Sequence, residues 1–125
     1  MPHSFDLSKI ISLLKKNPLT SEVETLMVDE IEKRGFYKLR CILIPSKYKL
    51  DIEYIKTEGD LLYSYQLYTE SDIARWDNEP HYPGLKNYPH HYHYGTDVES
   101  SELSGKPLED IRQIFSAISR IVDSI

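Results

Sequence analysis

The residues best suited to chemistry gather in one stretch, Arg75–Gly95, with the sequence RWDNEPHYPGLKNYPHHYHYG. It holds the single tryptophan of the chain and four of its five histidines, with an acid and an amide just before the first of them. Three prolines restrict φ along the stretch and disfavour a helix. Titratable and aromatic residues crowded into a proline-rich segment are typical of a functional loop. We therefore predict the functional site here, around Trp76, Asp77, Asn78, His81, His90, His91 and His93.

Metal-free acid–base catalysis is the first chemistry that such residues could perform. An imidazole has an ordinary pKa near 6.5, and a pair of them can donate and accept protons at neutral pH, each contributing ~10²–10⁴ in rate. If the segment from Pro89 is extended, His91 and His93 share one face of the strand and His90 lies on the other. The predicted catalytic residues are His81, His91 and His93, with Asp77 to orient a histidine and Arg75 to bind phosphate.

RNA is the substrate that this arrangement suggests, because cleavage through the 2′-hydroxyl needs an acid, a base and a cation for the phosphate. Exposed aromatic rings favour single-stranded RNA by stacking on its bases. The residues expected to bind substrate are Asn78, Tyr65, Tyr82, Lys86 and His90, with Tyr92 as a further stacking ring.

Two other interpretations of the histidines stay open. Imidazole and carboxylate groups are ligands for zinc or another divalent metal, and the set would be His81, His91, His93 and Asp77, although their spacing matches no standard zinc signature. Alternatively, the histidines only satisfy backbone groups of a loop that cannot pair internally, and the domain is a non-enzymatic interaction module.

The elements that position this stretch begin with a short amphipathic helix over Asp6–Lys16, capped by Ser4 or Asp6 and ended by Asn17-Pro18. Ser21-x-x-Glu24 has the form of a capping box and predicts a second helix to about Lys33. The alternation around Val23 also permits a strand there, so residues 22–34 are left undecided between helix and strand.

From Tyr37 the apolar period changes to two, which indicates strands. Alternating runs separated by tight turns predict an antiparallel meander of four or five strands. Pro107 begins a C-terminal amphipathic helix with an apolar stripe that runs to Ile125. The predicted fold is a single α+β domain over 1–125: a helical segment at 1–35, the sheet with its histidine loop at 36–95, and a helix at 106–125 packed with the N-terminal helices on one face. The strand Ile73–Asp77 would then turn Trp76 into the packed side and Arg75 and Asp77 to the open side.

Composition narrows the protein class. A chain of 125 residues with one cysteine and no long apolar segment is expected to be a cytoplasmic domain without disulfides, and Cys41 is expected in its core. The net charge of −5 argues against broad, nonspecific binding of nucleic acid. The sequence does not decide between a monomer and a dimer.

Several of these residues recur together in one family. The order Tyr63-Ser64-Tyr65, Arg75-Trp76-Asp77-Asn78-x-Pro80-His81 and Pro89-His90-His91-x-His93, followed by an amphipathic helix, resembles the TumE-type toxins of prokaryotic toxin–antitoxin pairs. The resemblance extends from about Tyr37 to the C-terminus, and Tyr82 stands where such proteins usually carry a second histidine. It implies a toxin whose partner is an antitoxin, commonly of helix-turn-helix type, and RNA is the target by analogy with other small toxins.

Overall fold

The computed structural model describes residues 5–123, and within that range the chain forms two helices and one antiparallel sheet. The helices are α1 (Leu7–Lys16) and α2 (Pro107–Asp123). The strands are β1 (Thr20–Ile31), β2 (Arg34–Leu43), β3 (Lys49–Lys56), β4 (Leu61–Tyr68), β5 (Asp72–Asp77), β6 (His91–Tyr94) and β7 (Asp97–Ser100). Each strand pairs with the next along the chain, so the sheet is a meander in the order β1 to β7. The α+β class is confirmed, but the prediction of four or five strands was too low.

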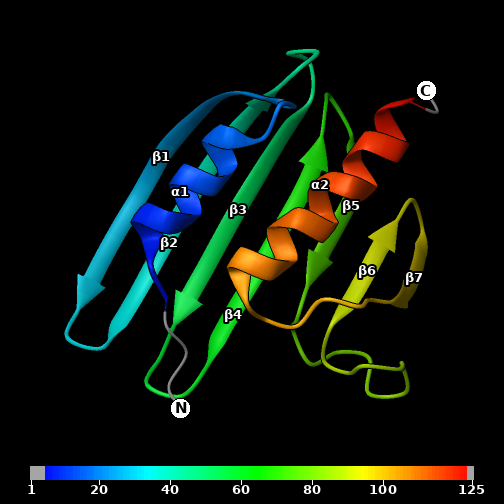
Figure 1. Cartoon of the computed structure of the whole chain (residues 1–125). Coiled ribbons are helices and arrows are strands. Elements are labelled where there is room, and N and C mark those ends of the chain that lie inside the picture. The colour runs from blue at the N-terminus through cyan, green and yellow to red at the C-terminus, as the bar shows by residue number, and fades with distance from the viewer. Residues whose placement is uncertain (1–4, 124–125) are drawn as a thin grey trace.

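Both helices lie on the same face of the sheet, side by side and roughly along the direction of its strands (Figure 1). The sheet face beneath them is apolar because alternate residues of β2, β3 and β4 point toward the helices, as in the buried pattern of Leu61, Tyr63, Tyr65 and Leu67. Ile10 and Leu14 of α1 and Ile114 and Ile118 of α2 complete the core. Within the described residues the opposite face carries no helix, and it presents polar side chains together with apolar ones such as Ile55 and Leu62, which are 40% and 38% exposed.

The prediction for the first helix is confirmed. The Asp6 side chain accepts a hydrogen bond from the Lys9 amide at 3.2 Å and caps the N-terminus of α1. At the other end the Asn17 side chain accepts from the Leu19 amide at 2.9 Å, across Pro18. His3, Ser4 and Ile125 lie outside the described residues.

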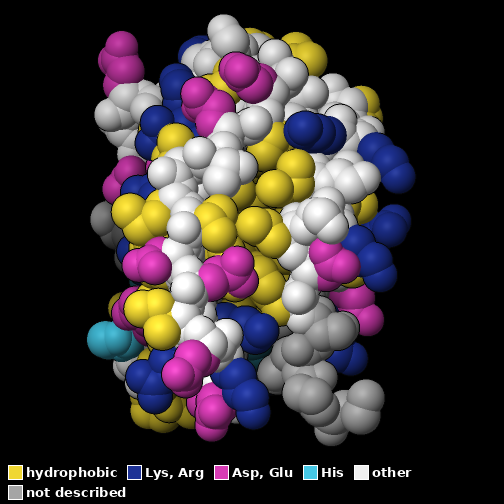
Figure 2. Space-filling model, turned by 90° about the vertical axis from the view of Figure 1, so that its left-hand side faces the viewer, with side chains coloured by type: hydrophobic (Ala, Val, Ile, Leu, Met, Phe, Trp, Pro, Cys, Tyr) yellow, Lys and Arg dark blue, Asp and Glu magenta, His cyan; other side chains and the backbone are white. Residues whose placement is uncertain are grey.

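Residues 22–34 were left undecided between helix and strand, and the strand is the one that forms, as β1; the helix suggested by the capping box at Ser21 was wrong. Long-range pairing decided the conformation: β1 runs antiparallel to β2 over most of its length, with partners such as Val23 and Cys41. A capping box is a weak local preference that such a ladder overrides. The hairpin turns at Glu32, whose φ is 57°. β1 forms one edge of the sheet, on the side of the molecule shown in Figure 2, where hydrophobic side chains gather along the middle of the surface.

The C-terminal part of the chain adds a strand that the sequence did not predict. Gly95, at φ 61°, turns the chain so that Asp97–Ser100 pairs with β6 as β7. The side chains of β7 are mostly polar and exposed, so the sequence shows no alternation that would indicate a strand. The helix from Pro107 is confirmed as α2, and no helix in the described range is both long and apolar enough to cross a membrane.

Candidate functional site

The open face of the sheet carries four polar side chains that β5 and β6 bring together. Arg75 pairs in register with His93, and Asp77 pairs with His91. Because alternate residues of a strand point to the same side, all four side chains project to the face opposite the helices, while Trp76 is buried on the helix side and stacks on Tyr92. The predicted division of β5 between a packed and an open side is therefore confirmed. We call Arg75, Asp77, His91 and His93 the β5–β6 cluster.

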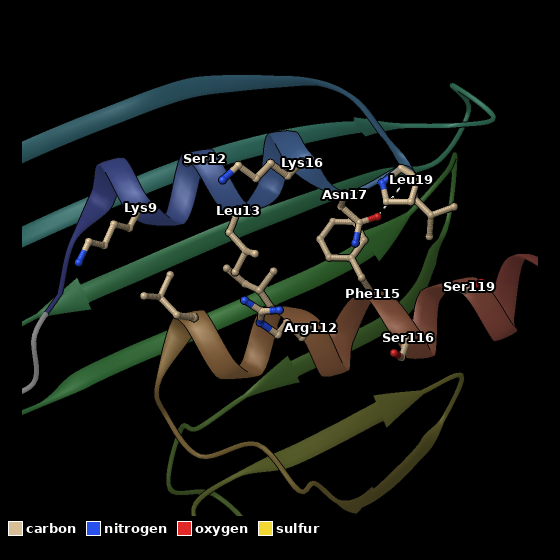
Figure 3. Close-up of a pocket in the computed structure, with 13 residues that line it drawn as sticks. Lys9, Ser12, Leu13, Lys16, Asn17, Leu19, Arg112, Phe115, Ser116 and Ser119 are labelled. Carbon is tan, nitrogen blue, oxygen red and sulfur yellow. Dashed lines mark hydrogen bonds between the residues drawn. The ribbon is translucent and has the colours of Figure 1, made fainter.

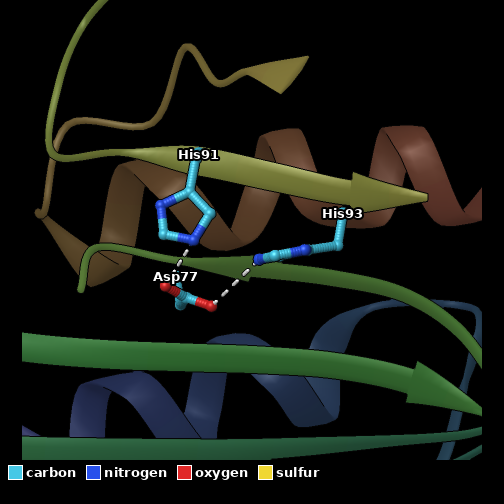
Figure 4. A group of neighbouring side chains, drawn as sticks. All are labelled: Asp77, His91 and His93. Atoms are coloured by element: carbon cyan, nitrogen blue, oxygen red, sulfur yellow. Dashed lines mark ion pairs between the residues drawn. The ribbon is translucent and has the colours of Figure 1, made fainter. Parts of the chain in front are cut away.

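Asp77 is the centre of the cluster, as Figure 4 shows for its two histidine neighbours. Its carboxylate is only 3% exposed, yet one oxygen, Oδ1, lies 2.9 Å from His91 Nε2 and accepts from the Glu79 amide at 3.1 Å. The other oxygen, Oδ2, lies 2.9 Å from Arg75 Nε and 3.8 Å from His93 Nε2. A carboxylate buried this deeply needs such partners, since an unpaired buried charge costs several kcal/mol, on the order of 3–5.

Arg75 contributes the positive charge next to that carboxylate. Its Nε atom is close enough to Asp77 Oδ2 for an ion pair, but the atom is buried and makes no hydrogen bond of acceptable geometry within the described structure. The two groups form an ion pair at 2.9 Å, and a small rotation of the side chain would align the N–H with the carboxylate. The side chain as a whole is 41% exposed, so its guanidinium reaches solvent from the edge of the cluster.

His91 is locked in place from both sides. Its Nδ1 atom lies 3.1 Å from the carbonyl oxygen of Pro89, and its Nε2 faces Asp77 Oδ1. Both of these oxygens accept hydrogen bonds, and each ring nitrogen of His91 faces one of them. His91 is 2% exposed as a residue, and a substrate in solvent does not reach it without movement of the loop above.

His93 is the histidine of the cluster that solvent reaches. Its side chain is 29% exposed. Partial burial lowers the pKa of His93 below its ordinary value of 6.5, and the nearby His91 and Arg75 lower it further, against an opposing effect of Asp77. A neutral imidazole at pH 7 with an accessible nitrogen is the state required of a general base.

The loop between β5 and β6 covers part of the cluster with an aromatic ring. Tyr82 packs edge-on against His91, with ring centroids 4.9 Å apart, and against His93 at 5.9 Å. The far end of the loop is held by Asn87, whose side chain donates to the carbonyl oxygens of Ser101 and Leu103 at 2.7 and 3.0 Å. Asn87 was not among the predicted residues; the available signal was its residue type, because an asparagine in a loop tolerates the left-handed region, where its φ of 65° lies.

Two residues predicted to bind substrate are used by the fold instead. Asn78 is 9% exposed, and its side chain accepts from the Tyr63 amide and donates to the Leu61 carbonyl, both at 2.9 Å, which fixes the start of the loop to β4. Tyr65 is 1% exposed beneath the helices and shares a 2.7 Å hydrogen bond with the hydroxyl of Tyr54. The expectation that Tyr65 stacks on bases was wrong, because strand alternation turns its ring into the core.

The remaining predicted residues lie around the cluster but outside it. His81 is 64% exposed and its Nε2 lies 3.0 Å from a carboxylate oxygen of Glu79, so the structure does not bring it to Asp77. His90 lies on the other side of β6, where it stacks on Tyr63 and its Nδ1 is 2.6 Å from the Tyr63 hydroxyl. Lys86 is exposed in the loop.

A shallow hollow of about 130 Å³ lies beside the cluster on the same face of the sheet. Arg75 forms one wall, and the rest comes from β2, β3 and β4. The acids of this region are matched by bases: Asp51 binds Arg40 through two contacts of 2.8 and 3.1 Å, and Glu53 lies 3.5 Å from Lys38. Lys38 and Arg40 are thus each paired with an acid on the neighbouring strand.

The cluster also has the donor set of a metal site. Asp77, His91 and His93 each offer one ligand atom, and these atoms lie within 4.8 Å of one another. Histidines that bind metal usually donate their second ring N–H to a carbonyl or carboxylate, as His91 is placed to do with Pro89. Arg75 opposes this use, because its charge already sits beside the carboxylate that would bind the cation.

Comparison with known proteins adds one positive finding. A family model described as Toxin TumE matches residues 10–125. The match begins inside α1, so it reaches further toward the N-terminus than the motifs that suggested the resemblance. The searches of curated proteins and of solved structures each found no match.

Proposed function

The chain belongs to the Toxin TumE family, and we propose that it is the toxin of a toxin–antitoxin pair that cleaves RNA at the β5–β6 cluster. The observation that carries the proposal is the contrast within this cluster. Asp77 and His91 are almost fully buried, whereas His93 and Arg75 reach solvent beside them. A fixed inner pair beneath two accessible groups is the arrangement expected of an active site that is held rigid from below.

In this proposal His93 is the base and Arg75 binds the phosphate. His93 removes the proton of a ribose 2′-hydroxyl, the 2′-oxygen attacks the adjacent phosphorus, and the bond to the 5′-oxygen breaks. The removed proton ends on that leaving oxygen, and the products carry a 2′,3′-cyclic phosphate and a 5′-hydroxyl. The Arg75 guanidinium neutralises charge that develops on the phosphate oxygens, and Tyr82, 38% exposed, offers its ring to a base.

His91 and Asp77 are positioning residues here. His91 was expected to be an acid or a base, but its burial and its two oxygen neighbours suit it to hold Asp77 in one orientation. Asp77 in turn orients Arg75 and faces His93. The second proton transfer, to the leaving 5′-oxygen, is therefore made by water or by the substrate.

Expression of His93→Ala and Arg75→Ala in a bacterial host tests the proposal, with His81→Ala as the matched control. His81 belongs to the same loop region but lies outside the cluster. We expect wild type and His81→Ala to arrest growth and to cut a labelled single-stranded RNA into cyclic-phosphate products. His93→Ala and Arg75→Ala should lose at least a hundredfold in cleavage rate, the usual contribution of a general base or of a preorganised charge.

The result is interpretable only if the variants fold, so their melting temperatures are measured beside the activity. Growth arrest and RNA cleavage that persist in folded His93→Ala rule out the catalytic role. A lower melting temperature without any relief of growth arrest instead supports a structural histidine loop in a non-enzymatic module.

A metal-dependent nuclease is the second candidate, and the three ligand atoms within 4.8 Å are the observation that favours it. In that case Asp77, His91 and His93 would bind zinc or another divalent cation that activates water for attack on the phosphate. Chelator separates the two mechanisms: cleavage by purified protein that is indifferent to EDTA excludes the metal version. Cleavage that stops with EDTA and returns with one divalent metal excludes the metal-free version.

Membership of a toxin family implies an antitoxin partner in general. We propose that this partner is a small helix-turn-helix protein encoded beside the toxin, and that both act in the cytoplasm, where the RNA is. Sequencing of the neighbouring gene and co-expression of its product test this: restored growth supports the pairing, and continued arrest contradicts it.

A further inference from the structure

A groove separates the two helices on the face opposite the β5–β6 cluster. It has a volume of about 780 Å³ and runs between α1 and α2, with Leu19 and Pro18 at one end. Figure 3 shows Leu13 of α1 and Phe115 and Arg112 of α2 pointing into the space between the helices. Ile111 and Phe115 form a buried apolar floor, and Leu108 stays 38% exposed at the margin.

The charges around the groove have one sign. Lys9, Lys16 and Arg112 line it, and no acidic residue does, although the whole chain carries a net charge of −5. Within the described residues neither Lys16 nor Arg112 makes an ion pair, whereas Lys38 and Arg40 on the other face are each paired with an acid. An apolar floor with a basic rim is complementary to a segment with one apolar face and acidic flanks.

We propose that this groove binds an acidic, amphipathic helix of the partner antitoxin. The two helices run side by side, and a third helix laid between them would bury its apolar residues on Leu13, Leu108 and Phe115. Acidic residues along its edges would face Lys9, Lys16 and Arg112, which favours association and fixes the orientation. The inference rests on the toxin identity stated above and not on RNA cleavage.

RNA is a poorer occupant of the same groove. Three basic residues are few for binding a phosphate backbone. The floor of the groove is aliphatic except for one phenylalanine, so it offers little for nucleobases to stack on. The groove also lies on the helix-covered face, away from His93, so a strand bound here would not be presented to the cluster.

The test titrates the purified antitoxin encoded beside this gene into the full chain by calorimetry. The double variant Lys16→Glu/Arg112→Glu reverses the basic rim, and Lys16→Arg/Arg112→Lys keeps its charge. Lys33→Glu/Lys47→Glu applies the same change of net charge at exposed positions outside the groove. We expect Kd to rise at least tenfold for the rim reversal and to change less than threefold for the other two variants. Leu108→Asp, at an exposed margin, should weaken binding as well.

Several outcomes overturn the proposal. They are no binding of the antitoxin by wild type, an unchanged Kd for the rim reversal, or an equal loss in the Lys33→Glu/Lys47→Glu control. Loss of affinity for a labelled single-stranded RNA instead of the antitoxin assigns the groove to nucleic acid. RNA cleavage by the rim variants without antitoxin is measured in parallel and should equal wild type. Failure of the docking proposal is thereby distinguished from failure of the catalytic one.

Discussion

Replacement of Asp77 by asparagine removes the charge at the centre of the β5–β6 cluster without changing its shape. The carboxylate lies within 3.1 Å of three groups, His91 Nε2, Arg75 Nε and the Glu79 amide. An asparagine has one oxygen for them, and its NH₂ group must then point at a donor on one side. Asp77→Asn therefore leaves a buried donor without an acceptor, whichever way the amide is turned.

The expected cost follows from the burial of these groups. Breaking a buried ion pair costs about 3–5 kcal/mol, but Arg75 is 41% exposed and regains water, which reduces the figure to about 3 kcal/mol. With an unfolding entropy of about 2.1 cal/mol/K per residue, this corresponds to a fall of about 10 °C in Tm for a chain of 125 residues. Asp51→Asn is the matched control, because Asp51 also binds an arginine but its side chain and that of Arg40 are 19% and 32% exposed. The control should lose about 1 kcal/mol.

Urea unfolding followed by circular dichroism measures both variants, with the midpoint and the slope compared with wild type. A loss for Asp77→Asn no greater than that for Asp51→Asn refutes the reasoning, because it would mean that the carboxylate does not hold the two strands and the arginine together. A double-mutant cycle with His91→Gln adds a second measure. The coupling energy should exceed about 1 kcal/mol if the 2.9 Å contact is maintained in solution.

Two further predictions concern neighbouring residues. Burial and nearby positive charges lower the pKa of His93 below 6.5, so the unfolded chain takes up a proton before the folded one as the pH falls. The contribution of neutral His93 to stability is therefore present above pH 6.5 and is lost as the pH falls toward the folded pKa. An NMR titration of the His93 ring should have its midpoint below 6.5, and a midpoint above 6.5 contradicts the geometry. Asn78→Ala removes both hydrogen bonds to β4 and should lower the free energy of unfolding by about 2–3 kcal/mol; if instead stability is kept and only RNA binding falls, Asn78 is a substrate ligand after all.

The central strands could be predicted from the sequence because the alternation that marks them is a local pattern. Alternation of apolar and polar residues along β3 and β4 reports which face of a strand is buried, whatever lies on that face. The same rule correctly divided Arg75 and Asp77 from Trp76 on β5. The two ends of the sheet gave weaker signals, since most of β1 and β7 is exposed and their side chains do not alternate. In β1 a capping-box pattern pointed to a helix, and only pairing with β2 revealed the strand.

The membership of the candidate site was decided by tertiary structure. By sequence alone the alternation of a strand separates His90 from His91 and His93, but it does not show which of the four histidines of the loop region, within thirteen residues of one another, meets Asp77. The register of β5 against β6 places His91 and His93 opposite Asp77 and Arg75, sends His90 to Tyr63 on the other face, and leaves His81 with Glu79 in solvent. The partners across strands are not contained in any local rule, because register depends on hydrogen bonds between strands.

Burial also separated the roles within the cluster. The sequence determined which residue types are present and, through the period of two, that His91 and His93 share a face. Only the packed structure decided that one of them is sealed between Asp77 and the Pro89 carbonyl while the other reaches solvent beneath the edge of Tyr82. The physical reason is that accessibility and hydrogen-bond partners belong to the whole fold. The chemical nature of a side chain, by contrast, is given by the sequence alone.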